Sequence, residues 1–306
     1  MPIVDNINRL RRERDALILS HTYQPSEVQD IADFVGDSYG LSKKAAGVDK
    51  DVIVFCGVRF MAETAAILNP ERTVILPDMN AGCPMADMIT ADELRELKSK
   101  NPDAAVVCYV NSTAEVKAES TICCTSSNAV QVVNSLGNDK DIIFVPDQFL
   151  GKFVERRTGR KMILWDGYCP THAVMQAGTV RKMRELHPDA EVMVHPECPP
   201  DVQDEADHVI STGQMCDLVA ETACRKFIVG TEQGIIHTLK KIAPAIEFVP
   251  LSPTMICPNM KKITLSKVER ALEKLAPVVD VPPDIANRAR RAVEAMLEVV
   301  EGKRGQ

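Results

Sequence analysis

The feature that most constrains the fold of this chain is an internal repeat with a period of about 87 residues. Four landmarks recur with the same pair of intervals, 88 and then 86 residues. They are Asp15, Asp103 and Asp189; His21, Tyr109 and His195; Val28, Val116 and Val202; and Ser38, Ser126 and Thr212. A loose likeness between stretches of one protein would not keep so many positions in phase. The sequence therefore predicts three copies of one structural unit.

Strand-like and helix-like segments alternate within each unit. The second unit shows this order clearly, with a helix at 93–100, a strand at 105–108 and a further strand at 142–145. Alternation at this spacing is typical of parallel strands joined by right-handed crossovers. We therefore expect an α/β fold of three α/β/α sandwich domains with parallel sheets, related by a pseudo-threefold axis around a central active site.

The expected domain boundaries follow the repeat. The first unit spans 1–88, the second 89–176 and the third 177–265, and a tail at 266–306 begins like a fourth unit before prolines interrupt it. We expect this tail to pack beside the first unit and to close the ring. Within the first unit, residues 27–35 are expected to form a helix.

The overall composition excludes several classes of function. The chain has 306 residues, 45% of them hydrophobic, and a formal net charge of −7 with scattered basic residues. This charge argues against a surface for nucleic acid or anionic membranes. No apolar run approaches the ~20 residues of a membrane span, and the polar N-terminal segment is unlike a signal peptide. We expect a cytoplasmic protein whose ten cysteines are metal ligands or reduced core thiols.

Three Cys-Pro steps share the phase of the repeat. Cys83, Cys169 and Cys257 each follow a strand-like run and a short turn, at intervals of 86 and 88 residues. Proline is favoured at the first position of a helix, so each thiol should lie near a helix N-terminus, where the thiolate is stabilised. A fourth step, at Cys198, is out of phase, and we expect its loop to face the site.

Three converging thiolates can hold a metal, and their spacing bears on which one. Structural zinc usually requires four ligands that include a closely spaced cysteine pair, and intervals of 86 and 88 residues provide no such pair. An iron–sulfur cubane with three cysteine ligands leaves one iron open as a Lewis acid. We favour the open-iron cluster; a catalytic zinc site and a site without metal remain alternatives.

Ligands of open parallel sheets bind beyond the carboxyl ends of the strands. Each unit keeps chemically unusual residues there, and a threefold arrangement would aim them at one cavity. They are His21 and Tyr23, Tyr109 and Asn111, and His195 and Glu197. Glu197 is a candidate general base or substrate orienter, and Tyr23 a candidate acid. His172 follows Cys169 by one helical turn and is expected to reach the same cavity.

A hydroxyl residue also recurs before a helical run in each unit, as Ser38, Ser126 and Thr212. Hydroxyl groups and free backbone N–H groups at the start of a helix can bind carboxylate or phosphate. An ordinary N-cap is the simpler interpretation of any one of them. Their shared phase with the strand-end residues favours a role in binding.

Several segments of the chain resemble the quinolinate synthase family, iron–sulfur enzymes of NAD biosynthesis. These segments are HTYQPSEVQDIADFVGDS, YVNSTAEVKA, VHPECP, STGQM, GTEQGIIH and CPNMKK, in the order of the family. The resemblance spans nearly the whole chain, and the family has three pseudo-threefold related α/β domains. It implies a transferase-class enzyme that condenses iminoaspartate (iminosuccinate) with dihydroxyacetone phosphate to give quinolinate, phosphate and two waters. An upstream enzyme that produces iminoaspartate would then be a partner.

The resemblance also implies roles for individual residues. Cys83, Cys169 and Cys257 would ligate a 4Fe–4S cluster. Substrate would be bound by His21, Ser38, Tyr109, Val110, Asn111, Ser126, His195, Pro196, Glu197 and Thr212. The catalytic residues would be Tyr23, Glu197, His195 and His172. Tyr23 and Glu197 would handle protons, and His172 would lie near the open iron.

One departure from the family concerns the third cysteine ligand. Some members carry a C-x-x-C-x-x-C segment there, proposed to be sensitive to redox conditions. In this chain Cys257 is followed by Pro-Asn-Met, so that control is not expected.

Two other functions remain open. One is a different three-cysteine 4Fe–4S dehydratase of the same architecture, acting on another phosphorylated or dicarboxylic substrate. The other is a non-catalytic iron–sulfur sensor, which would not need His21, Tyr23 and Glu197 to face its cluster.

Overall fold

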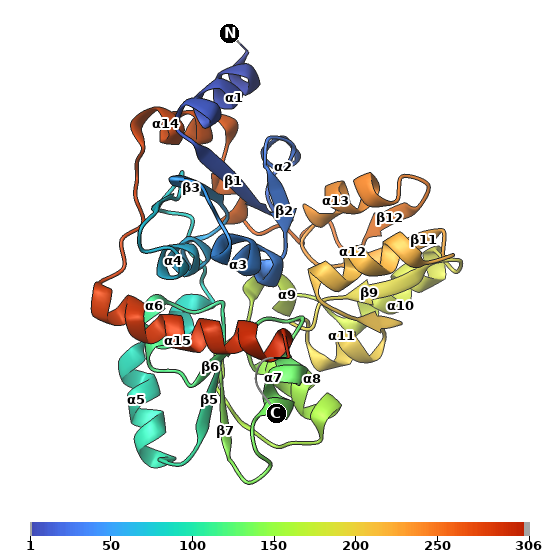
Figure 1. The fold of residues 1–306 in the computed structure, drawn as a ribbon. Helices are drawn as coiled ribbons and strands as arrows, with labels where there is room; N and C mark the ends of the chain where they lie inside the picture. Colours follow the sequence, from blue (N-terminus) through green and yellow to red (C-terminus); the bar gives the residue numbers. More distant parts are fainter. Residues whose placement is uncertain (1, 303–306) are drawn as a thin grey trace.

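Residues 2–302 are described in the computed structural model, and over this part of the chain three four-stranded sheets alternate with helices (Figure 1). Every strand pairing within the three sheets is parallel. Within the same residues, no helix is both long and apolar enough to cross a membrane.

The first unit begins with an amphipathic helix whose Ile7 and Leu10 are buried. Its elements are α1 (Ile3–Glu13), β1 (Ala16–His21), α2 (Ser26–Asp30), β2 (Phe34–Gly36), α3 (Ser38–Ala46), β3 (Val52–Cys56), α4 (Arg59–Leu68), β4 (Thr73–Ile75) and the 3-10 helix η1 (Ala86–Met88). All residues of β3 are buried. This pattern is typical of a parallel strand that is covered on both faces.

The second unit begins with a helix whose N-terminus is stabilised by a capping box. Thr90 accepts the backbone N–H of Glu93, whose side chain accepts the N–H of Thr90 in return. The elements are α5 (Ala91–Lys100), β5 (Ala105–Tyr109), α6 (Ala114–Ala118), β6 (Ile122–Cys124), α7 (Ala129–Ser135), β7 (Ile142–Val145), α8 (Gln148–Thr158), β8 (Ile163–Leu164) and α9 (Pro170–Ala173).

The third unit repeats this order, and the tail follows it. The unit contains α10 (Ala177–Leu186), β9 (Glu191–Val194), α11 (Pro200–Asp204), β10 (His208–Val209), α12 (Thr212–Glu221), β11 (Lys226–Gly230), α13 (Ile235–Ile242), β12 (Glu247–Pro250) and the 3-10 helix η2 (Met260–Lys262). The tail contains α14 (Leu265–Lys274) and α15 (Pro283–Val300).

The strand order is the same in all three sheets. It reads β2-β1-β3-β4, β6-β5-β7-β8 and β10-β9-β11-β12. The phased valines Val28, Val116 and Val202 are all fully buried, so the same position of the repeat packs into the core of each unit. The prediction of an α/β fold with three parallel-sheet units is confirmed.

The helix expected at 27–35 is correct only in its first half. α2 is short, and β2 follows it as an edge strand beside β1. Between them the carboxylate of Asp33 accepts the N–H of Ile18 in β1 at 2.8 Å, which stabilises the turn out of the helix. The equivalent contacts in the other units join Thr121 to Val106 and Asp207 to Val192. This turn into an edge strand is therefore part of the repeat.

The two tail helices lie in different places. α14 packs against α1 of the first unit, as expected. α15, the red helix of Figure 1, instead lies across α6 and β6 of the second unit and also contacts α4 and α7. Its buried face consists of Ala289, Ala292, Val293, Ala295, Met296 and Val299. The expectation that the tail packs beside the first unit is right for α14 and wrong for most of α15.

We predict that Met296→Ala destabilises the protein by about 2–5 kcal/mol, because the fully buried Met296 side chain would leave a cavity between α15 and the second unit. Urea unfolding measures this change in the free energy of unfolding. Glu294→Ala, on the exposed side of the same helix, should change it by no more than about 0.5 kcal/mol. Equal effects of the two substitutions would contradict the packing described.

Candidate active site

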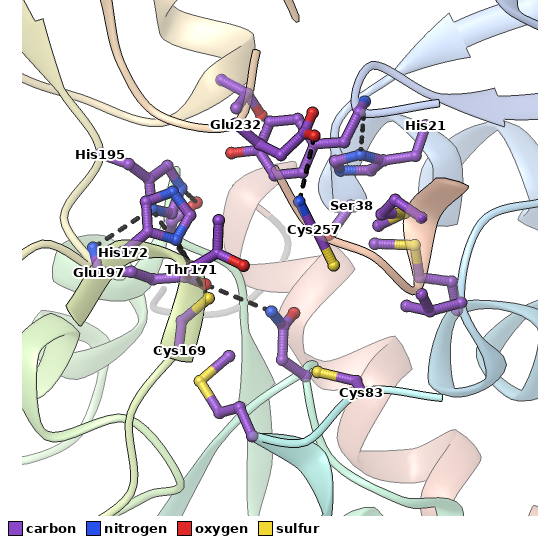
Figure 2. Close-up of a pocket in the computed structure, with 18 of the residues that line it drawn as sticks. His21, Ser38, Cys83, Cys169, Thr171, His172, His195, Glu197, Glu232 and Cys257 are labelled. Carbon is purple, nitrogen blue, oxygen red and sulfur yellow. Dashed lines mark hydrogen bonds and ion pairs between the residues drawn. The ribbon is translucent and has the colours of Figure 1, made fainter. Parts of the chain in front are cut away.

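The three units meet around one cavity. Figure 2 shows side chains from all three units around this space, including the three phased cysteines. The predicted site residues that line it are His21, Tyr23, Ser38, Cys83, Tyr109, Asn111, Ser126, Cys169, His172, His195, Glu197, Thr212 and Cys257. Residues far apart in the sequence therefore form a single site.

The three phased cysteines follow the last strand of their units. Cys169 is the N-cap of α9, a helix of four residues, whereas Cys83 and Cys257 lead into the 3-10 helices η1 and η2. Burial raises the pKa of Cys83 to about 12 and also raises the pKa values of Cys169 and Cys257. The thiols therefore lie at or just before short helical segments, as expected, but burial outweighs the stabilisation of the thiolates there.

Backbone N–H groups of these short helical segments favour the thiolates. In each loop a backbone N–H three residues after the cysteine hydrogen-bonds to the sulfur and opposes the effect of burial on its pKa. The pairs are Ala86 with Cys83, His172 with Cys169 and Met260 with Cys257. Hydrogen bonds to ligating sulfurs tune cysteine-bound clusters. Three loops of one design, one from each unit, fit a cysteine-ligated metal centre.

The thiols of this site are unpaired and influence one another. All ten cysteines of the chain are free. After burial, nearby negative charge also raises the pKa values, including that of Cys257 on Cys83 and that of Cys83 on Cys169. A metal centre among these thiols would offset the repulsion between their thiolates, and three free cysteines that line one cavity fit a 4Fe–4S cluster. Cys169, His172 and Glu197 also place one donor atom each within 4.8 Å of one another, a set that suits a single metal ion.

Two histidines present the same ring atom to the cavity. In His21 and His195, Nδ1 accepts the backbone N–H of Tyr23 at 3.1 Å and of Glu197 at 3.2 Å, respectively. A neutral imidazole that accepts at Nδ1 carries its proton at Nε2. Nε2 of each ring is therefore a hydrogen-bond donor, and that of His195 lies 3.1 Å from the Ser126 hydroxyl.

Burial keeps these two rings neutral. Loss of water lowers the pKa of His21 to about 3 and that of His195 to about 4, even though the charge of Glu197 opposes the shift. At neutral pH both side chains therefore offer N–H donors rather than positive charges.

Glu197 is the carboxylate at the centre of the hydrogen-bond network. Its Oε1 accepts the Tyr109 hydroxyl at 2.6 Å and the Asn111 amide at 3.3 Å, and its Oε2 lies 2.8 Å from His172 Nδ1. Burial opposes ionisation, but the imidazoles of His195 and His172 and the hydrogen bonds outweigh burial and lower the pKa of Glu197. Glu197 is therefore ionised although it is buried.

A chain of hydrogen bonds connects Glu197 with Tyr23 of the first unit. Because His172 donates from Nδ1 to Glu197, its Nε2 can accept from the Thr231 hydroxyl, which lies 2.8 Å away. Thr231 Oγ1 lies 2.5 Å from the Tyr23 hydroxyl. Burial raises the pKa values of Tyr23 and Tyr109 well above their usual range, so both phenols keep their protons. The chain draws residues from all three units.

The phased hydroxyls are not the N-caps of their helices. Asp37 caps α3 and Ser211 caps α12, each by accepting a backbone N–H, so the adjacent Ser38 and Thr212 are the first helical residues. Their hydroxyls line the cavity together with Ser126. The capping interpretation therefore applies to their neighbours, and these hydroxyls are available to a ligand.

Three residues selected from the sequence lie outside the cavity lining. Val110 and Pro196 are buried, and their backbone groups hydrogen-bond to Cys124 and Gln203, respectively. Cys198 was expected to face the site, and this expectation is wrong. Cys198 is fully buried in a hydrophobic cluster of the third unit, because its loop directs the thiol back toward the sheet.

Several residues of the site were not predicted from the sequence: Glu232 lines the cavity, and Thr231 contacts Tyr23 and His172. Thr231 and Glu232 directly follow β11, so their place at the carboxyl end of a strand was an available signal. Further lining residues are Asp37, Val58, Phe60, Met61, Gly82, Met85, Thr125, Thr171 and Met260. Most of these are apolar or small, and a sequence pattern does not distinguish them from ordinary core residues.

The fold and the site define a three-unit α/β enzyme with thiols, neutral imidazoles and carboxylates, Glu197 at their centre, in a buried pocket. A family model described as quinolinate synthetase A protein matches residues 5–298. Three similar proteins, each named quinolinate synthase, come from Dehalococcoides mccartyi (strain CBDB1; 55% identical, 97% of this chain and 98% of the relative), Desulforudis audaxviator (53%; 96% and 97%) and Methanosarcina barkeri (51%; 97% and 97%). The chain belongs to the quinolinate synthase family of enzymes.

We predict that the free energy of unfolding of the metal-free protein falls as the pH is lowered from about 6.5 to 5. The unfolded chain binds protons on His21 and His195 near pH 6.5, whereas in the folded chain their pKa values are about 3 and 4. Each histidine therefore contributes about 2 kcal/mol to the loss over this window. Urea unfolding across this pH range measures it. His195→Gln should reduce the loss of unfolding free energy over this pH range by the contribution of one histidine. An unchanged pH dependence would contradict the conclusion that His195 is neutral in the folded protein.

Proposed function

We propose that the protein condenses iminoaspartate with dihydroxyacetone phosphate to form quinolinate, phosphate and two waters. The observation that carries the proposal is the convergence of Cys83, Cys169 and Cys257 with Glu197 and Tyr23 on one buried cavity in a chain of this family. The reaction involves no net change of redox state. It requires carbon–nitrogen and carbon–carbon bond formation and the removal of water and phosphate, which are tasks for acid–base and Lewis-acid groups.

The cofactor in this proposal is a 4Fe–4S cluster held by Cys83, Cys169 and Cys257. When bound, a cluster with three cysteine ligands supplies an open iron that acts as a Lewis acid on a substrate oxygen. The free thiols and the repeated N–H donors to their sulfurs support this assignment. The remainder of the proposal concerns the protein's own residues.

Substrate anions would bind to neutral donors. His21 and His195 offer Nε2–H, and Ser38, Ser126 and Thr212 offer hydroxyl groups. Ser38 and Thr212 also begin helices α3 and α12, whose free N–H groups favour negative charge. Carboxylates of iminoaspartate and the phosphate of the triose match such donors.

Protons would move through the network centred on Glu197. The ionised carboxylate can accept a proton, and Tyr109 and Tyr23 can donate hydrogen bonds because their pKa values are raised. Thr231 and His172 connect Tyr23 with Glu197, so a proton given up at one end can be replaced through the chain. Tyr23 then serves as an acid and Glu197 as a base.

A dehydratase of the same architecture with another dicarboxylic or phosphorylated substrate is the second candidate. The donors that line the cavity would also bind the anionic groups of other dicarboxylic or phosphorylated substrates. A sensor without catalytic activity is disfavoured, because the similar proteins are named as enzymes and the acid–base residues face the same cavity as the thiols.

We predict that anaerobically purified protein contains about four irons and four sulfides per chain. Each of Cys83→Ser, Cys169→Ser and Cys257→Ser should lose most of this iron and all quinolinate formation. Cys216→Ser, a partly buried cysteine outside the cavity lining, is the matched control and should keep both. Bound zinc without iron would overturn the cluster assignment, and a full cluster without quinolinate formation would favour the other dehydratase.

We also predict that Thr231→Val lowers kcat at least tenfold while the iron content stays at the wild-type level. Valine matches threonine in shape but cannot link the Tyr23 hydroxyl to His172. Thr231→Ser restores the hydroxyl and should recover most of the activity. Steady-state kinetics of the iron-loaded variants measures the difference, and equal activity of the two variants would exclude a role for the hydroxyl.

A further inference from the structure

Glu232 lies in the third unit and has a buried side chain with a complete set of partners. It follows β11 and is fully buried. Its Oε1 lies 2.8 Å from Lys261 Nζ and accepts the backbone N–H of Cys257 at 3.2 Å, and its Oε2 accepts the N–H of Gly234 at 2.7 Å. A buried carboxylate is tolerated only when it is paired in this way. Its position beside a proposed cluster ligand is visible in Figure 2.

Lys261 extends this arrangement to the first unit. Its ammonium group contacts Glu232 and also donates to the backbone carbonyl of Tyr23. The hydroxyl of Tyr23 is held at its other end by Thr231. The third unit thus holds both ends of the Tyr23 residue, through Thr231 after β11 and Lys261 in η2.

The backbones at this junction are in close contact. A Cβ atom added to Gly234 would lie 2.8 Å from the carbonyl carbon and oxygen of Tyr23 and 2.8 Å from Glu232 Oε2. Gln29 of the first unit adds a hydrogen bond from its side-chain amide to the carbonyl of Gly234 at 2.9 Å. Glu232 and Lys261 therefore act where the first and third units touch.

The other two units show that this pair is specific to the Cys257 loop. Two residues beyond the equivalent strand, the second unit has Asp147, which is buried, caps α8 and has an Oδ2 without a hydrogen-bond partner among the described residues. The first unit has the apolar Val58 there. The Cys83 loop is held differently, by an ion pair between Lys267 and Asp78, and the Cys169 loop contacts the Asp147 carboxylate. Cys83 and Cys169 therefore provide internal comparisons whose loops do not depend on Glu232 and Lys261.

We propose that Glu232 and Lys261 are positioning residues that fix the loop of Cys257 and the backbone of Tyr23 relative to each other. The inference rests on the proposed function, because it takes Cys257 as a cluster ligand and Tyr23 as an acid. The pair aligns a metal ligand of the third unit with a proton donor of the first. Loss of the pair should loosen Cys257 selectively and leave the other two ligands in place.

The test measures the three thiols separately in the cluster-free protein. Wild type, Lys261→Met and Glu232→Gln are alkylated anaerobically with iodoacetamide, and the rate at each cysteine is followed by mass spectrometry. Because iodoacetamide reacts with the thiolate and Lys261 lowers the pKa of Cys257, each rate is measured as a function of pH and corrected for the thiolate fraction. We expect the corrected rate at Cys257 to rise about tenfold in Lys261→Met, while the corrected rates at Cys83 and Cys169 stay within about twofold of wild type. Lys262→Met, whose ammonium contacts the Asn80 carbonyl in the loop of Cys83 instead, is the matched control and should leave the rate at Cys257 at the wild-type level. Lys261→Arg, which keeps the charge, should restore most of the protection.

Two results would overturn the proposal: equal acceleration at all three cysteines, which would indicate general loosening, or no acceleration at Cys257. Glu232→Gln, which keeps the shape of the buried side chain, should show the same selectivity at Cys257 as Lys261→Met. In the iron-loaded protein, Lys261→Met should also release iron to a chelator faster than Lys262→Met does. The alkylation pattern needs neither cluster nor substrate. Selective exposure of Cys257 in a protein that makes no quinolinate would therefore reject the proposed function and support the positioning role of Glu232 and Lys261.

Discussion

Parallel pairing within each sheet is the constraint on which the rest of the structure depends. All four strands of a parallel sheet end at the same edge, so the residues that follow them are gathered there. The first strands of the three units, β1, β5 and β9, are flanked on both sides in their sheets. The residue at or just beyond the end of each is therefore central, and these residues are His21, Tyr109 and His195. Three sheets that meet at such edges produce one site without any long connecting loop.

Burial then determines the protonation states in that site, because it lowers the pKa values of histidines and raises those of tyrosines. Desolvation makes His21 and His195 neutral and keeps Tyr23 and Tyr109 protonated. It would also neutralise Glu197, but the donors around Glu197 prevent this. The neighbours of a buried acid therefore decide its state: the pKa of Glu197 is lowered beside His195 and His172, whereas the pKa of buried Asp147 is raised although backbone N–H groups donate to it. The pocket holds its acid and its base in opposite states because their partners differ.

Much of the site follows from the repeat in the sequence, and the remainder depends on tertiary contacts. The strand-end residues and the phased cysteines were predicted because position in a parallel unit determines where a residue lies. Thr231 was not found, because a threonine after a strand has no pattern that reveals its contacts with Tyr23 and His172. The helical segments after Cys83 and Cys257 are only short 3-10 helices, because proline permits a helix start without providing the residues that continue it. The position of α15 depends on its alanine-rich face fitting α6, which periodicity alone does not specify.

The repeat also separates residues that build the scaffold from residues that perform chemistry. At the positions of Gln29, Lys117 and Gln203, each unit uses a long buried donor to hold the carbonyl of its first loop, at Gln24, Ser112 and Cys198. Two positions that face the cavity have diverged instead. They read His21, Tyr109 and His195, and Tyr23, Asn111 and Glu197. Three identical units would form a symmetric pocket, which could not hold an acid and a base in separate places. Retaining the scaffold donors while changing the strand-end residues gives a symmetric framework with an asymmetric site, which the proposed condensation of two unlike molecules would require.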